Sequence, residues 1–257
     1  MELKIDKAGG VCTITLNRPD VFNSFNESMA KALQSALDDC ENDDDVRTIV
    51  ITGEGKAFCA GQDLAEAIDP NGPELTSIVR DHYNPIIMRL RAIEKPIIAA
   101  VNGVAAGAGA NIALACDLTL AKESASFIQA FSKIGLIPDS GGTYFLPRIV
   151  GMQKALGLMM TGEKVSAAYA DSMGMIYKCV SDDDFEAEIS KLANYLAGMP
   201  TRGLGLTKKA VQAGFSNDLK TQLELEEVLQ TEAGQTHDFN EGVNAFLEKR
   251  KPAFTGK

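Results

Sequence analysis

A single carboxylate, Asp139, lies in the otherwise apolar, glycine-rich segment FSKIGLIPDSGG at residues 131–142. Pro138 stiffens the backbone before it, and Gly141 and Gly142 loosen the backbone after it. An aspartate in such a place can form a turn or cap a helix. It can also act as a base, because an apolar surrounding raises the pKa of a carboxyl group towards neutrality. The second interpretation predicts a reaction that one acid can perform.

Two glycine-rich segments could bind negative charge, GKAFCAGQDLAE at residues 55–66 and NGVAAGAGANIALACD at residues 102–117. Each follows an apolar run and leads into a stretch that can begin a helix. Exposed N–H groups at such a junction attract anions, and small side chains let a ligand approach the backbone. Either segment alone can equally be a tight turn or a close helix–sheet contact. Together they can direct two N–H groups at one oxygen atom, which would form an oxyanion hole.

The elements that must position these groups follow from the hydrophobic pattern. Apolar runs at 11–17, 46–55, 95–103 and 117–121 predict β-strands. A helix is expected after Asn26, which can cap it. Strands that alternate with helical segments favour crossover units around a buried sheet. After about residue 150 the pattern is mostly helical.

Composition excludes several classes of function. Asp and Glu number 35 against 25 Lys and Arg, a net charge of −10, which disfavours nucleic-acid and anionic-membrane binding. The five cysteines are odd in number and form no C-x-x-C pair, as expected of reduced thiols in a cytoplasmic protein. The only histidines, His82 and His237, are far apart, so no metal site is expected. The N-terminus is too polar for a signal peptide, and no apolar run reaches transmembrane length.

The ordered motifs FCAGQDL, KPIIAAVNGVAAGAGANIALACD and IGLIPDSGGT resemble those of the crotonase (enoyl-CoA hydratase/isomerase) superfamily. The segments NRP, MTGEKVSAAYADSMGMI and EGVNAFLEKRKPAF match as well, so the resemblance covers essentially the whole chain. It implies an α/β fold in which ββα units form a spiral core at residues 1–195. A helical oligomerisation region at 196–257 would follow, giving a homotrimer or a dimer of trimers. The implied ligand is an acyl-CoA thioester, with CoA as part of the substrate and no separate cofactor.

The resemblance also assigns roles to individual residues. The oxyanion donors would be the N–H groups of Gln62 and Ala108. Phe246 and Lys249 of a neighbouring subunit would cover the adenine. Without the resemblance, Lys249 and Lys56 would be read as ordinary solvated lysines. The CoA contacts, mostly through backbone, would be Lys56, Ala60, Gln62, Asp63 and Leu64.

The sequence departs from the hydratases of this superfamily at two positions. They carry a glutamate inside the second glycine-rich helix start and another before IGLIP, where this chain has Asn111 and Phe131. Neither residue can exchange a proton, so hydration is disfavoured. Asp139 matches an acidic position of some isomerases and of a dehalogenase. Phe131 is then expected either as a wall for an aromatic ring or as core packing, and Asn111 as a substrate contact or a helix-start residue.

His82 and Tyr83 fall in a segment that often lines the acyl pocket in this superfamily, although a lone histidine is more often a surface or capped core residue. Within the superfamily, the motifs most resemble isomerases of aromatic CoA thioesters in phenylacetate degradation. These enzymes isomerise a ring epoxide and move a β,γ double bond to the α,β position. The alternatives are a hydratase or an enoyl- or dienoyl-CoA isomerase of fatty-acid oxidation, a dehalogenase-like nucleophilic role for Asp139, and a non-catalytic CoA-binding scaffold.

Overall fold

The computed structural model describes all 257 residues and contains two β-sheets. The larger sheet has six strands in the spatial order β1-β2-β3-β5-β7-β10, and the smaller has four in the order β4-β6-β8-β9. The strands of the larger sheet are β1 (Leu3–Ala8), β2 (Val11–Leu16), β3 (Thr48–Gly53), β5 (Ile97–Val101), β7 (Leu118–Lys122) and β10 (Lys178–Val180). Those of the smaller sheet are β4 (Ala57–Cys59), β6 (Val104–Ala106), β8 (Ser126–Ile128) and β9 (Lys164–Ser166).

The chain alternates between the two sheets as it winds. β3, β5 and β7 enter the larger sheet as parallel neighbours, and each is followed by a strand of the smaller sheet, β4, β6 and β8. A helical segment then leads to the next turn of the spiral. Because β3, β5 and β7 are mutually parallel, as are β4, β6 and β8, the loops that leave successive strands of each set lie at one edge. This repetition brings segments far apart in sequence to one place.

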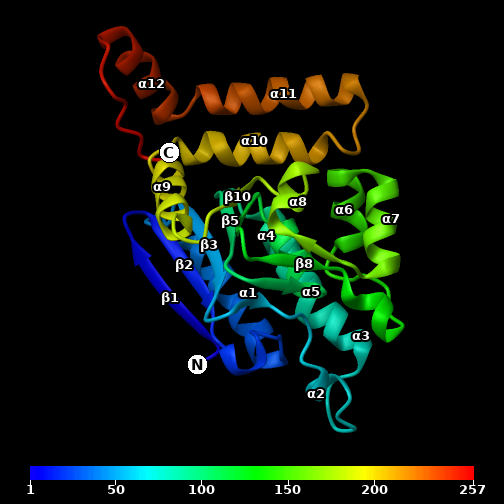
Figure 1. The fold of residues 1–257 in the computed structure, drawn as a ribbon. Coiled ribbons are helices and arrows are strands. Elements are labelled where there is room, and N and C mark those ends of the chain that lie inside the picture. Colours follow the sequence, from blue (N-terminus) through cyan, green and yellow to red (C-terminus); the bar gives the residue numbers. More distant parts are fainter.

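Helices surround the sheets (Figure 1). The longer ones before residue 200 are α1 (Glu27–Asn42), α4 (Asn84–Ala92), α5 (Ala108–Ala115), α6 (Gly142–Val150), α7 (Met152–Thr161), α8 (Ala167–Ser172) and α9 (Phe185–Ala197). The short ones are the 3-10 helices η1 (Pro19–Val21) and η3 (Ala130–Ile134), the π-helix η2 (Ile78–Tyr83), α2 (Leu64–Ala67) and α3 (Leu75–Ser77). Asn26 caps α1 as predicted, because its side chain accepts a hydrogen bond from the N–H of Met29.

The main hydrophobic core of 45 buried residues joins the sheets to α1, α4 and α5. Helix α9 covers the other face of the larger sheet over a second cluster of eight buried residues. All eight residues of α5 are buried, which its small side chains permit. Gly109 shows how close the packing is, because a Cβ there would lie 2.4 Å from the carbonyl oxygen of Cys59. The small residues of α5 therefore let it press directly against β4.

The last three helices are α10 (Thr201–Ala213), α11 (Leu219–Gly234) and α12 (His237–Glu248). Figure 1 shows α10 and α11 side by side, with α11 farther from the sheets. Lys208 connects α10 to the core, since its Nζ donates to Asp117 at 2.9 Å and to the carbonyl of Leu90 at 2.7 Å. α11 buries only Leu229, and Phe246 of α12 is 83% exposed. The outer helices thus present apolar side chains to solvent.

The strands predicted at 11–17, 46–55, 95–103 and 117–121 are confirmed as β2, β3, β5 and β7. The predicted change to mainly helical structure after residue 150 is also confirmed, apart from the short strands β9 and β10. The sequence pattern did not separate the short β6 from α5, which it treated as one helical segment. None of the helices combines the length with the apolar character that a membrane crossing requires.

Candidate active site

The first glycine-rich loop connects β4 to α2 and is held by residues near the start of the chain. The N–H of Phe25 donates to the carbonyl of Gly61 at 2.7 Å, and the N–H of Asp63 donates to the carbonyl of Phe25 at 2.8 Å. This short parallel pairing uses the groups on either side of Gln62, so the Gln62 N–H points away from it. Asp63 also caps α2 and pairs with Arg18 at 2.9 Å. The loop therefore presents a free N–H from a fixed backbone.

The second loop connects β6 to α5 through Gly107, whose φ of +53° lies in the left-handed region that favours glycine. Ala108 is the first residue of α5. Its N–H has no acceptor one turn earlier within the helix, as is general for a helix start. The N-terminal end of a helix also carries partial positive charge. Ala108 thus offers a second N–H suited to an oxygen that gains negative charge.

The two loops converge. A Cβ added to Gly61 would lie 3.0 Å from the carbonyl oxygen of Ala106 and 3.5 Å from the nitrogen of Ala108. Gly61 has a φ of +96°, so a side chain there would be strained as well as crowded. The free N–H groups of Gln62 and Ala108 come from these touching segments. The arrangement can polarise a carbonyl oxygen placed between them.

The side chain of Gln62 braces its loop. Its Oε1 accepts a hydrogen bond from the hydroxyl of Tyr83 at 2.7 Å, and its Nε2 donates to Glu66 at 2.9 Å. Glu66 in turn accepts from the N–H of Glu27, in the first turn of α1, at 2.9 Å. Burial, with smaller contributions from Cys59 and Asp139, raises the pKa of Tyr83 well above its usual value. Tyr83 therefore stays a neutral donor to Gln62.

Asp139 lies in the turn between η3 and α6. Its carbonyl oxygen accepts from the N–H of Gly142 at 2.8 Å, and its Oδ1 accepts from the hydroxyl of Ser140 at 2.9 Å. Ser140 is buried and has a φ of +50°, which is unusual for a residue with a side chain. Asp139 itself is half-buried. Burial raises the pKa of its carboxyl group, and the Ser140 hydrogen bond opposes that rise. The raised pKa makes this carboxylate a stronger proton acceptor than an ordinary aspartate.

Asn111 and Phe131 both lie close to this turn. Asn111 is fully buried, and its Nδ2 donates to the carbonyl of Asp139 at 2.8 Å while its Oδ1 accepts from Gln129 at 2.8 Å. Both ends of its amide are therefore occupied by protein groups. Phe131 is buried against the second loop, because its ring edge lies 3.8 Å from where a Cβ of Gly107 would stand. It forms an apolar wall beside the converging loops.

The other residues predicted to contact CoA lie in two places. Lys56, Ala60 and Leu64 are exposed on and beside the first loop. Phe246 and Lys249 are exposed on and just after α12, which lies at the opposite end of the molecule from α2 (Figure 1). They are therefore too far from the first loop of their own chain to contact a ligand there.

His82 is buried beside α1, where its carbonyl accepts from Gln34 at 3.0 Å and its Nδ1 has no partner. Tyr83 is the member of this pair that reaches a predicted site residue. Sequence reasoning missed the braces Ser140, Glu66 and Gln129. Of these, only Ser140 had a signal, namely its place next to Asp139.

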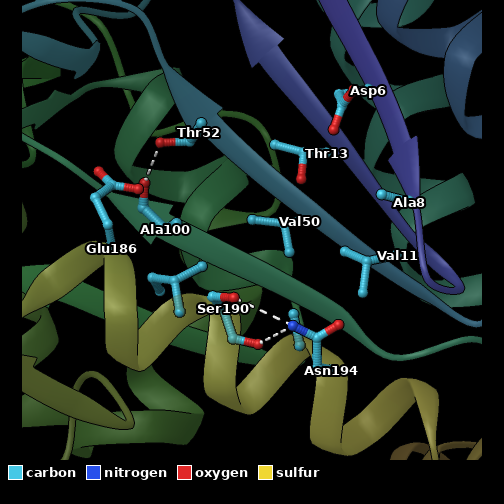
Figure 2. A pocket seen from close by; sticks show the side chains of 12 residues that line it. Asp6, Ala8, Val11, Thr13, Val50, Thr52, Ala100, Glu186, Ser190 and Asn194 are labelled. Carbon is cyan, nitrogen blue, oxygen red and sulfur yellow. Dashed lines mark hydrogen bonds between the residues drawn. The ribbon is translucent and has the colours of Figure 1, made fainter.

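Two hollows lie apart from these residues. A groove of about 810 Å³ runs between α4, α6 and α10 and touches the Asp139 turn only at Gly141. A hollow of about 250 Å³ lies between the larger sheet and α9. Figure 2 shows Asp6 and Thr13 on its sheet side and Ser190 and Asn194, hydrogen-bonded to each other, on its helix side. Gln62, Ala108 and Asp139 line neither hollow.

Comparison with known proteins places this geometry in context. Residues 6–257 match the model of the family described as enoyl-CoA hydratase/isomerase. The chain is 50% identical over 251 residues to 1,2-epoxyphenylacetyl-CoA isomerase of Escherichia coli (strain K12), covering 96% of each chain. It is 47% identical to the "Probable enoyl-CoA hydratase" of Rhodobacter capsulatus, over 99% of this chain and 98% of that one. The crystal structure of enoyl-CoA hydratase from Bacillus anthracis superposes with a TM-score of 0.93 at 33% identity, covering 100% of both chains.

Proposed function

The chain belongs to the enoyl-CoA hydratase/isomerase family, whose fold it shares, and from this premise we propose that it is an isomerase of acyl-CoA thioesters with Asp139 as its single base. The favoured reactions are conversion of 1,2-epoxyphenylacetyl-CoA to an oxepin-CoA and transfer of a β,γ double bond to the α,β position. The 50% identity to 1,2-epoxyphenylacetyl-CoA isomerase supports this choice of acyl group.

The proposed mechanism needs one proton acceptor. The thioester oxygen lies between the N–H groups of Gln62 and Ala108, which stabilise the enolate formed when Asp139 removes the α-proton. For a β,γ-unsaturated substrate, protonated Asp139 returns the same proton to the γ-carbon. For the epoxide, the proton is returned to the same substrate as the ring expands. No atom is gained or lost, so no second acid or activated water is required.

One observation carries the proposal. Asp139 is half-buried with a raised pKa, and its turn is hydrogen-bonded to the helix that begins with Ala108. Asn111 follows Ala108 by three residues, about 4.5 Å along the helix axis. A base whose turn is tied to this helix one turn from a proposed oxyanion donor suits removal of a proton adjacent to a carbonyl. The apolar wall formed by Phe131 agrees with an aromatic acyl group.

The decisive experiment incubates the purified protein with 1,2-epoxyphenylacetyl-CoA and, separately, with a 3-enoyl-CoA, and identifies the products by mass spectrometry and NMR. Formation of oxepin-CoA or 2-enoyl-CoA supports the proposal. Tight binding of both thioesters without turnover would instead favour a CoA-binding scaffold. Rapid turnover of only the aliphatic substrate would assign the protein to fatty-acid isomerisation.

Hydration is the other activity of the family, and we expect little or no hydration of crotonyl-CoA. Hydration needs one group to activate water and a second to protonate the α-carbon, but Asn111 and Phe131 cannot transfer protons and the Asn111 amide is already bonded at both ends. Loss of the conjugated-thioester absorbance measures the rate. Hydration as fast as isomerisation would show that the catalytic groups lie elsewhere.

The pH dependence of the reaction is expected to shift in Ser140→Gly. Glycine suits the positive φ at this position but cannot donate to Asp139. In the native protein the hydrogen bond from Ser140 lowers the pKa of Asp139, so the pKa of Asp139 should rise when this bond is removed. Because the ionised form is the base, the acid limb of the kcat/KM profile should move to higher pH. Ser140→Ala removes the same donor and should shift the profile in the same direction, whereas an unchanged limb in both variants would contradict the assignment of the base.

We further propose that the protein assembles as trimers, alone or in pairs. This proposal is based on the apolar side chains that α11 and α12 expose, among them Leu223, Val228, Phe246 and Leu247. A helix with apolar residues on more than one face needs partners on more than one side. Light scattering should give at least three times the 27.4 kDa chain mass at micromolar concentration. A monomer under those conditions would contradict the proposal.

A further inference from the structure

A chain of two buried amides ends on the backbone of Asp139. Gln129 donates from Nε2 to Oδ1 of Asn111 at 2.8 Å, and Asn111 donates from Nδ2 to the carbonyl oxygen of Asp139 at 2.8 Å. The direction of the chain is fixed by its end, because a carbonyl oxygen can only accept. Asn111 must therefore turn its NH₂ group towards Asp139 and its oxygen towards Gln129. Gln129 must then present its own NH₂ group, which sets the orientation of Asn111.

The packing around Asn111 leaves it little freedom. A Cβ on Gly142, the first residue of α6, would lie 2.3 Å from the Asn111 Nδ2. The amide thus passes directly beneath the backbone of the Asp139 turn. The N–H of Gly142 donates to the same Asp139 carbonyl at 2.8 Å, so this oxygen is held by two donors. The backbone of Asp139 is fixed from the α5 side and from the α6 side together.

This arrangement is retained at a cost to stability. The Oε1 atom of Gln129 is buried without a hydrogen-bond partner, although the residue is only 2% exposed. A buried polar atom that is left without a hydrogen-bond partner lowers the stability of the folded protein. Ser140, next to Asp139, is held in a left-handed conformation that non-glycine residues avoid. Unpaired atoms and strain of this kind gather where geometry matters more than stability.

We propose that Asn111, oriented by Gln129, is a positioning residue that ties the Asp139 turn to α5 and thereby fixes the base relative to the Ala108 N–H. This inference rests on the proposed role of Asp139 as the base and of Ala108 as an oxyanion donor. The base and the oxyanion donor are then both held by one helix, since Ala108 begins α5 and Asn111 lies one turn later. The backbone that carries the carboxylate is thereby held at a fixed place relative to a thioester bound at the start of that helix.

Kinetics of Asn111→Leu test the proposal. Leucine keeps the shape but removes the donor to Asp139, and a misplacement of about 1 Å can cost about 10²-fold in rate. We expect kcat to fall by about that factor while KM stays within about threefold, because the CoA-binding loop is untouched. Gln129→Met should lower kcat in the same direction but less, because Asn111 keeps its donor and loses only its orientation. Thr119→Val is the matched control, since it removes a buried hydrogen bond to α5, from Thr119 to the Ala113 carbonyl, at a distance from Asp139.

A double-variant comparison separates positioning from general stability. If Asn111 acts through Asp139, then Asn111→Leu should cost little further activity in an Asp139→Asn background. A wild-type kcat in Asn111→Leu, or the same loss in both backgrounds, would overturn the proposal.

Hydrogen exchange of the segment at 136–144 provides a readout that needs no activity. It should quicken in Asn111→Leu and not in Thr119→Val, and unchanged exchange in Asn111→Leu would overturn the proposal. Should the native protein prove inactive towards the thioesters, the proposed function fails, while this measurement still decides whether Asn111 holds the turn.

Discussion

Asp139→Asn is expected to lower kcat for isomerisation by roughly 10²–10⁴, the usual contribution of a positioned general base. Asparagine keeps the size of the side chain and can still accept from Ser140, but it cannot take up the α-proton. Affinity for the CoA thioester should change little, because the predicted ligand contacts lie on the loops and not on Asp139. Initial rates and equilibrium binding on the same preparation measure the two effects separately.

We expect the Asp139→Asn variant to be more stable than the native protein, by an amount that depends on pH. Burial raises the pKa of Asp139 in the folded protein, so ionisation of this residue opposes folding. That cost is absent below the ordinary aspartate pKa of about 3.9 and fully present above the raised value. Asp139→Asn should therefore melt at a higher temperature than the native protein at neutral pH, and the gain should shrink as the pH falls towards the ordinary range. The rate of the native enzyme should also decrease as the pH is lowered through this range, because Asp139 becomes protonated.

Asp218→Asn is the matched control for a capping aspartate, because Asp218 caps α11 through the N–H of Thr221, far along the chain from the site. Asparagine also caps helices and forms turns well. If Asp139 were only a turn residue, Asp139→Asn would behave like this control. Native turnover in Asp139→Asn would end the proposal of a base at this position.

Gly109→Ala is expected to lower kcat by about 10²–10³, the loss typical of a missing oxyanion donor. The added Cβ would lie 2.4 Å from the carbonyl oxygen of Cys59 and 2.6 Å from its Cβ, so α5 and β4 must separate. The Ala108 N–H would then move away from the Gln62 N–H. Single-turnover rates should show the loss, with circular dichroism to verify the fold.

Gly157→Ala serves as the control for this second variant. Gly157 lies in α7 with no atom within 4 Å of an added Cβ, so alanine there should leave the rate unchanged. Gly61→Ala, at the first loop, should resemble Gly109→Ala, because its φ of +96° and the 3.0 Å approach to Ala106 both oppose a side chain. Full activity in both loop variants would exclude a polarising role for the converging backbone.

The larger sheet was predictable where burial imposes a pattern. β3 and β5 are almost entirely buried and read as continuous apolar runs, and β2 alternates as a half-buried strand should. β1 was not predicted, because its alternation is confined to Leu3–Asp6 and only Leu3 of its six residues is buried. The smaller sheet was not predicted, because its strands are three residues long and too short to show a periodicity in the sequence.

The site was predictable in its local parts and not in its connections. A lone acid in an apolar turn and two glycine-rich junctions are visible in the residues themselves. The contact of Asn111 with Asp139 spans 28 residues, and that of Tyr83 with Gln62 spans 21. Such contacts depend on the winding of the chain between two sheets, and no local pattern encodes them. The sequence left the role of Asn111 open for this reason.

The backbone origin of the two proposed oxyanion donors has a consequence for how this protein can change over generations. An N–H group is supplied by every residue except proline, so the chemistry of the donors at positions 62 and 108 does not itself depend on a particular side chain. Selection would act instead on the neighbouring glycines, where Gly61, Gly107 and Gly109 leave no room or no conformation for a side chain. A library of single substitutions should therefore show strong intolerance at these glycines as well as at Asp139, although the glycines make no contact with the substrate through a side chain.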